Sequence, residues 1–149
     1  MQKLLVVDDD PLTLECFRLL FPGDEVDVYT AMSASEGIQE FQSRDPDVVV
    51  LDVHLPDQSG LEAIRRFHQA DARVPVILMT GYGKADTAIE AMRLGAHDYV
   101  VKPLETDSLR TVIRRAFEIG RLMRVPARLG DSAVEDETSD LLVGECPAM

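Results

Sequence analysis

Acidic side chains follow directly after two short apolar runs of this chain. Asp8 and Asp9 come after the run that ends at Val7, and Asp52 comes after the run that ends at Leu51. Carboxylates that converge on one crevice repel each other, by about 4 kcal/mol for a pair at ~4 Å and an effective dielectric constant of about 20. A divalent cation would relieve this repulsion. Ligand sets made only of oxygen atoms, with positions left open for water, favour magnesium.

Two further polar side chains follow later apolar runs. Thr80 comes after Met79 and supplies a hydroxyl group, and Lys102 comes after Val101 and supplies a positive charge. A protonated lysine does not bind a metal ion, but it does hold an anion. A cation, an ammonium group and a hydroxyl group around an aspartate predict a pocket for a phosphoryl group, with Asp52 as the candidate nucleophile.

These side chains meet only if the apolar runs are neighbouring parallel strands. Apart from Asp27 in the second run, the runs contain no charged side chain, which is typical of strands buried on both faces of a parallel sheet. They are residues 4–7, 26–29, 48–51, 76–79 and 99–101. Each run is followed by a segment with helical periodicity, so the sequence predicts an α/β fold of five βα units. In such sheets, ligands bind beyond the carboxyl ends of the strands.

Capping signals indicate where the helices begin. Asp10 before Pro11 favours a helix start, and Ser33 and Ser59 are each followed by a glutamate three residues later. The last helix is expected from about Thr106 to Met123, with apolar residues on one side and arginines on the other. The first helix is expected to present one apolar face, formed by Leu12, Cys16, Leu19 and Leu20.

The formal charge of −12 is spread unevenly over the 149 residues. Residues 1–62 carry 14 acidic and 3 basic side chains, residues 63–130 carry 7 and 12, and residues 131–149 carry 6 and none. An acidic chain is a poor ligand for nucleic acids and anionic membranes, so neither partner is expected. Two distant cysteines suit a reducing compartment, and every apolar run is far shorter than the roughly 18 residues of a membrane span. A cytoplasmic protein is therefore expected.

The character of the sequence changes after Met123. Pro126, Gly130 and the acidic, Ser- and Thr-rich stretch 131–140 do not bury enough apolar surface to offset the entropy of ordering. We therefore expect one domain over residues 1–123 and a flexible linker over residues 124–149.

In their order along the chain, these motifs resemble the receiver domain of bacterial two-component response regulators, over residues 1 to about 123. The matching segments are residues 6–10, 51–56 with Ser59 and Gly60, 79–81 and 99–103. The resemblance implies a flavodoxin-like, doubly wound parallel sheet with strand order 2-1-3-4-5 and helices on both faces. It thereby gives the predicted α/β fold a definite topology.

The resemblance also implies a phosphoacceptor and a set of Mg²⁺ ligands. Asp52 would accept the phosphoryl group and bind the metal ion. Asp9 would bind the ion directly, Asp8 would bind it through water, and the main-chain carbonyl of His54 would be a further ligand.

Three further roles concern the response to phosphorylation. Lys102 would bind the phosphoryl group and would be joined to Pro103 by a cis peptide bond. Thr80 would be the switch hydroxyl and Tyr99 the switch aromatic residue, although Tyr99 could equally be a core side chain. The receiver would assist its own phosphorylation and dephosphorylation, and would not be an enzyme acting on a separate substrate.

The implied partner is a sensor histidine kinase, whose phosphohistidine would supply the phosphoryl group. A homodimer through the fourth helix, the fifth strand and the fifth helix is expected, without direct contact of this chain to nucleic acid. Residues 141–149 resemble the beginning of the ATPase domain of sigma-54-dependent activators of the nitrogen-regulator class. We therefore expect the chain to be the N-terminal part of such a transcriptional activator.

Two alternatives remain at this point. The first is a stand-alone receiver that acts by docking on a partner. The second is a phosphatase of the haloacid dehalogenase type, which uses a strand-end aspartate, magnesium, a threonine and a lysine on a similar fold. Those phosphatases need an aspartate two positions after the nucleophile, where this chain has His54, and their motifs come in a different order.

Overall fold

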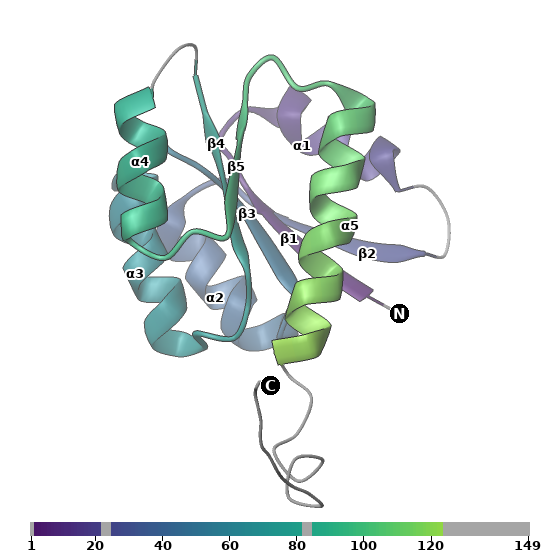
Figure 1. Cartoon of the computed structure of the whole chain (residues 1–149), viewed down its shortest axis with the longest axis horizontal. Helices are drawn as coiled ribbons and strands as arrows, with labels where there is room; N and C mark the ends of the chain where they lie inside the picture. Colours follow the sequence, from purple (N-terminus) through teal and green to yellow (C-terminus); the bar gives the residue numbers. More distant parts are fainter. Residues whose placement is uncertain (1, 22–24, 82–84, 124–149) are drawn as a thin grey trace, which may run out of the picture.

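The computed structural model describes residues 2–21, 25–81 and 85–123 (Figure 1). Strands and helices alternate throughout these residues. The strands are β1 (Gln2–Val7), β2 (Val26–Ala31), β3 (Val48–Asp52), β4 (Val76–Thr80) and β5 (Asp98–Val101). The helices are α1 (Pro11–Leu20), α2 (Ala34–Arg44), α3 (Gly60–Ala70), α4 (Ala85–Arg93) and α5 (Thr106–Met123). The linker expected over residues 124–149 lies outside the described residues.

The strands form one parallel sheet in the order β2-β1-β3-β4-β5, which confirms the predicted fold class. Helices cover both faces of the sheet. In Figure 1, α1 and α5 lie on one side, and α2, α3 and α4 lie on the other. Because all five strands run in one direction, their carboxyl ends meet at a single edge, the upper one in Figure 1.

Two apolar cores hold the helices against the sheet, one on each face. Alternate residues of β1 point to opposite faces, so Leu5 and Val7 join one core and Leu4 and Val6 join the other. The first core includes Phe41 of α2 and Phe67 of α3, whose ring centroids are 5.1 Å apart in an edge-to-face arrangement. The central strands are buried on both sides, which explains their uninterrupted apolar sequences.

Helix α1 presents a different face to the sheet from the one expected. Its buried residues are Thr13, Leu14, Phe17 and Leu20. Leu12 is 77% exposed, Leu19 is 68% exposed and Cys16 is exposed, so the expected face was wrong except at Leu20. Two apolar stripes compete on this helix. The stripe that contains Phe17 removes the larger apolar surface from water, and it is therefore the one that packs on the sheet.

The predicted capping residues begin the helices as expected. Asp10 accepts a hydrogen bond from the Leu12 N–H, and Ser33 accepts one from the Glu36 N–H. Ser59 accepts one from the Leu61 N–H at the start of α3. These caps end the preceding loops at fixed points, which matters because those loops surround the carboxyl edge of the sheet.

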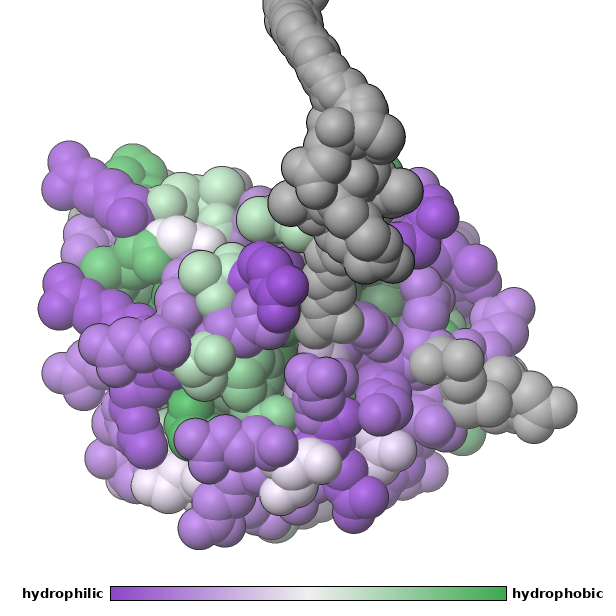
Figure 2. All heavy atoms as spheres, turned by 90° about the horizontal axis from the view of Figure 1, so that it is seen from below, coloured by the Kyte–Doolittle hydropathy of each residue, from purple (hydrophilic) through white to green (hydrophobic). Residues whose placement is uncertain are grey.

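The end of the molecule opposite the carboxyl ends of the strands is mostly hydrophilic, as Figure 2 shows. None of the described helices is both long enough and apolar enough to span a bilayer.

Candidate functional site

The carboxyl edge of the sheet brings together four of the predicted site residues. Asp8 directly follows β1, Asp52 ends β3, Thr80 ends β4 and Lys102 directly follows β5. Parallel pairing of β1 with β3, β3 with β4 and β4 with β5 places these strand ends side by side. These residues are expected to meet if the strands are parallel neighbours. The strands are parallel, and the residues lie at the same edge of the sheet.

Asp8 is completely buried, and both of its carboxylate oxygens accept hydrogen bonds. Oδ2 lies 2.9 Å from Nζ of Lys102, and Oδ1 accepts the main-chain N–H of Asp10 at 3.0 Å. The N–H of Asp8 donates to the carbonyl of Ala31 in β2. Burying an ionised carboxylate without such partners destabilises the folded protein. The ion pair with Lys102 therefore helps to stabilise Asp8 in its buried position.

Asp52 is only 6% exposed and is less completely neutralised than Asp8. Its Oδ2 lies 3.5 Å from Nζ of Lys102, and its Oδ1 accepts the His54 N–H at 3.4 Å. Burial and the neighbouring charge of Asp8 raise the pKa of Asp52 above its ordinary value, against the opposing effect of Lys102. Negative charge at Asp52 is therefore incompletely balanced, which favours a cation beside it.

Lys102 is the cation that links the two buried carboxylates. Burial alone would lower its pKa, but the hydrogen bond to Asp8 and the charges of Asp52 and Asp8 outweigh burial and raise the pKa. The main-chain N–H of Lys102 donates a hydrogen bond to the carbonyl of Thr80, and the peptide bond between Lys102 and Pro103 is cis. The lysine side chain is 30% exposed, so it is partly open to solvent.

Asp8, Asp9 and Asp52 form a group that could hold a metal ion. Each offers one carboxylate oxygen, and these oxygens lie within 4.8 Å of one another. Magnesium binds oxygen at about 2.0 to 2.1 Å, so opposite direct ligands lie roughly 4.2 Å apart. The three oxygens are therefore close enough together to share one ion. The all-oxygen donor set fits Mg²⁺, and Asp9 is exposed at the mouth of the crevice.

A small cavity of about 130 Å³ lies next to this cluster. It is lined by Val53, His54, Thr80, Gly81 and Thr87. Thr80 is 2% exposed, and its hydroxyl lies 3.5 Å from the carbonyl of Val100, at the limit of a hydrogen bond. The cavity leaves space beside the Thr80 hydroxyl, and this hydroxyl has a weak hydrogen-bond partner in the Val100 carbonyl.

Tyr99 is not brought into this cluster. It lies on β5 with 42% of its surface exposed, so it is not a core residue in this structure. It lines a groove of about 420 Å³ between β5 and α5, together with Val101, Leu104 and Val112. The predicted switch residues therefore occupy two places, with Thr80 in the crevice and Tyr99 on the outer surface.

Asp57 belongs to the surroundings of the site, and sequence reasoning did not single it out. It lies five residues after Asp52, yet its carboxylate accepts N–H groups from Ala34 and Ser35 at the start of α2. These contacts span more than twenty residues of sequence. No local motif signals such a contact, and only the fold reveals it.

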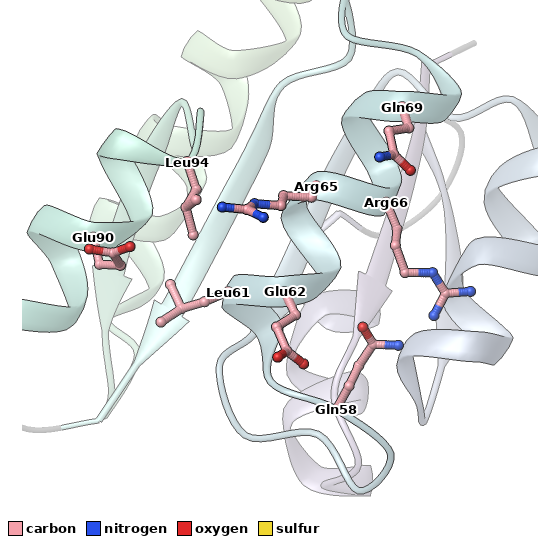
Figure 3. Close-up of a pocket in the computed structure, with 8 residues that line it drawn as sticks. All are labelled: Gln58, Leu61, Glu62, Arg65, Arg66, Gln69, Glu90 and Leu94. Carbon is pink, nitrogen blue, oxygen red and sulfur yellow. The ribbon is translucent and has the colours of Figure 1, made fainter.

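A second hollow, of about 590 Å³, runs over the outer face of α3 and reaches α4. Figure 3 shows Arg65 and Leu61 directed toward α4, and Arg66 directed to the opposite side of α3. Its charged residues are of both signs, with Glu62 and Glu90 beside the arginines. None of the predicted site residues lines this groove.

A family model described as "Response regulator receiver domain" matches residues 4–114. The chain belongs to this family. Asp8, Asp52, Thr80 and Lys102 all lie within the matched residues. The match favours a receiver over the phosphatase considered above.

Three curated relatives are regulatory proteins. The chain is 38% identical over 122 residues to the C4-dicarboxylate transport transcriptional regulatory protein DctD of Pseudomonas aeruginosa, and 33% identical over 119 residues to the regulatory protein AtoC of Escherichia coli. These matches cover 81% and 80% of this chain, but 26% of each relative. The response regulator protein PilR of P. aeruginosa is 34% identical over 149 residues, which cover 99% of this chain and 31% of PilR. The chain thus spans about a quarter to a third of these relatives.

Solved structures show the same fold. A response regulator receiver domain protein from Clostridium thermocellum is 34% identical, with a TM-score of 0.76 over 83% of this chain and 99% of that chain. NtrX from Brucella abortus, in complex with ADP, is 30% identical, with a TM-score of 0.79 over 87% of this chain and 29% of that chain. The matched region makes up nearly all of the first solved chain and less than a third of the second.

Replacing Lys102 by methionine should destabilise the metal-free protein. The change leaves Asp8 buried without its cation. For a fully buried pair, such a loss lowers the free energy of unfolding by about 3 to 5 kcal/mol. Because Lys102 is partly exposed, we expect a smaller loss of ~2 to 3 kcal/mol. Denaturant unfolding in chelator-treated buffer measures this loss.

The double variant with Lys102→Met and Asp8→Asn should regain about half of the lost stability, because one buried carboxylate, Asp52, is then left without its cation instead of two. Arg115→Met on the exposed side of α5 is the control, with an expected change within about 0.5 kcal/mol. A Lys102→Met protein as stable as the parent would contradict the role of this ion pair.

Proposed function

We propose that this receiver accepts a phosphoryl group on the carboxylate of Asp52 from a phosphohistidine of a sensor histidine kinase. The proposal rests chiefly on one observation: Asp52 is a buried, incompletely neutralised carboxylate with an ammonium group at 3.5 Å and two further carboxylates within reach of a shared cation. That combination suits a nucleophile whose product carries additional negative charge. The family match supports the same function.

In this proposal, the carboxylates of Asp9 and Asp52 and the main-chain carbonyl of His54 would hold Mg²⁺ directly, and Asp8 would hold it through water. When bound, the ion neutralises negative charge on the acceptor and on the phosphoryl oxygens. The three carboxylates fit such an ion by donor type and spacing, and His54 directly follows the strand end that bears Asp52.

The transfer is an in-line displacement in which one bond forms as another breaks. A carboxylate oxygen of Asp52 bonds to phosphorus, the phosphorus–nitrogen bond to the donor imidazole breaks, and the imidazole leaves with its electron pair. Lys102 balances the charge that arrives at the crevice, because its ammonium group already lies between Asp8 and Asp52. Attack of water on phosphorus later releases phosphate and restores the aspartate. The receiver thus assists both reactions on itself.

Thr80 and Tyr99 then carry the signal outward. The Thr80 hydroxyl, weakly placed against Val100, would turn to donate to a phosphoryl oxygen. The carbonyl of Thr80 accepts the Lys102 N–H, so the ends of β4 and β5 respond together. When the end of β5 moves, the exposed ring of Tyr99 would change its position. The surface formed by α4, β5 and α5 would change with it.

That surface is the proposed homodimer interface. It exposes large apolar side chains, which are a reason for another protein surface to cover it. They are Ile89, Met92, Tyr99 and Val101, exposed by 58%, 47%, 42% and 45%. This chain itself would make no contact with nucleic acid.

The output under control is proposed to be sigma-54-dependent activation of transcription by further domains of a longer protein. The match to PilR extends over 99% of this chain and therefore continues past the receiver. A stand-alone receiver that docks on a partner is the alternative, and the reading frame of the gene distinguishes the two. We also propose a cytoplasmic location, because a histidine kinase uses ATP to make the phosphohistidine that donates the phosphoryl group.

Incubation with Mg²⁺ and acetyl phosphate should add one phosphoryl group to the protein, as intact-protein mass spectrometry would show. The adduct should disappear in Asp52→Asn, because the amide oxygen is a far weaker nucleophile than the carboxylate. Glu62→Gln is a control, since it removes a carboxylate from the exposed start of α3 and should still form the adduct. An adduct that persists in Asp52→Asn would refute the assignment.

Beryllofluoride with Mg²⁺, which imitates the phosphorylated aspartate, should change the oligomeric state measured by light scattering. Ile89→Lys should prevent the dimeric form, because it places a charge on the apolar surface of α4. Leu12→Lys, which changes an even more exposed residue on α1, should leave the dimer intact. An identical mass with and without beryllofluoride would contradict the proposed dimer switch.

A further inference from the structure

The loop between β3 and α3, residues 53–59, is closed firmly at its base. The Gly60 N–H donates to the carbonyl of Val53 at 2.7 Å, and His54 pairs with Ser59 in an isolated antiparallel bridge. A Cβ atom on Gly60 would lie 2.2 Å from the carbonyl oxygen of Asp52, so only glycine fits there. The base of the loop therefore keeps a fixed position relative to the phosphoacceptor strand.

The far end of the same loop is tied to a different helix by Asp57. One carboxylate oxygen accepts the Ala34 N–H and the other accepts the Ser35 N–H, each at 2.9 Å. In the part of the chain that the structure describes, these are the hydrogen bonds that join the loop to a helix other than α3. The packing of Leu55 against the first core is a further contact, but an apolar and non-directional one.

Helix α2 already has its own capping residues without Asp57. Ser33 accepts the Glu36 N–H, and the side chain of Glu36 accepts the Met32 N–H. Asp57 takes the two N–H groups that remain near the start of the helix, where the helix dipole also favours a negative charge. Burial raises the pKa of Asp57, but the hydrogen bonds from Ala34 and Ser35 together outweigh burial and lower the pKa to about 2. The carboxylate is therefore ionised near neutral pH, and the tie is present there.

We propose that Asp57 is a positioning residue of the phosphorylation site, which holds the β3–α3 loop against α2 so that the main chain at His54 is ready to bind the metal ion. This inference rests on the proposed function, because it concerns the Mg²⁺ site of Asp8, Asp9 and Asp52. Asp57 itself touches neither the metal ion nor the phosphoryl group. Its contribution is to reduce the freedom of a loop that supplies one ligand from its backbone.

Loss of this tie should weaken Mg²⁺ binding without removing it. Replacing the direct hydrogen-bond partner of a ligand typically lowers metal affinity by about 10- to 100-fold, and a tie acting through the loop backbone should have a smaller effect, about 3- to 10-fold. The rate of phosphorylation at saturating Mg²⁺ should stay within about twofold of the parent, since every reacting group is retained.

The test compares Asp57→Ala, Asp57→Asn and Glu62→Gln with the parent protein. Mg²⁺ affinity is measured by titration of amide chemical shifts without a phosphoryl donor, and the Mg²⁺ dependence of phosphorylation by acetyl phosphate is measured separately. Asp57→Ala should bind Mg²⁺ more weakly, and Asp57→Asn should lie between it and the parent, because the amide oxygen still accepts one hydrogen bond. Glu62→Gln removes the same charge from the exposed start of α3 and should behave as the parent.

Hydrogen exchange gives a second readout that does not involve metal. Amides of residues 53–59 and 34–36 should exchange faster in Asp57→Ala, while those of α5 should be unchanged. Mg²⁺ affinity in Asp57→Ala equal to that of the parent, or weakened equally by Glu62→Gln, would overturn the inference. Absence of Mg²⁺ binding in the parent protein would instead overturn the proposed function, so the two failures are distinguishable.

Discussion

The electrostatic conflict at the carboxyl edge of the sheet is the constraint on which the site depends. Asp8 and Asp52 are buried next to each other with Asp9 at the crevice mouth, and one ammonium group, that of Lys102, lies between the buried pair. One positive charge does not balance three negative ones. The crevice therefore attracts a further cation, and a site with two cationic centres is suited to hold a phosphoryl group.

Much of this arrangement could be predicted from the sequence, because in a parallel sheet the residues that follow the strands all lie at the same edge. A polar residue directly after a buried strand must lie at the carboxyl edge, and this argument alone brings Asp8, Asp52, Thr80 and Lys102 together. The caps at Asp10, Ser33 and Ser59 were also predictable, since a cap bonds to N–H groups only two or three residues away. Helix caps and the positions of residues at strand ends are therefore the features that could be predicted best from this sequence.

Long-range packing was not predictable in the same way. Helix α1 has two apolar stripes of helical spacing, and the choice of Phe17 over Leu12 and Leu19 is made by the core that receives the helix. The tie between Asp57 and α2 likewise depends on how α2 and the β3–α3 loop meet. The exposed position of Tyr99 depends on β5 being an edge strand between α4 and α5. Each of these features is decided by tertiary contacts that leave no local pattern.

Thermal unfolding with and without Mg²⁺ tests the central claim most directly. The account predicts that Mg²⁺ raises the melting temperature of the parent, by linkage that reaches about 2.7 kcal/mol at ~100 times the dissociation constant. Asp9→Asn should melt higher than the parent without metal, because repulsion is relieved, and should lose the response to Mg²⁺. Asp27→Asn, an exposed acid on β2, should respond like the parent. A parent protein whose melting temperature is unchanged by millimolar Mg²⁺ would contradict the account.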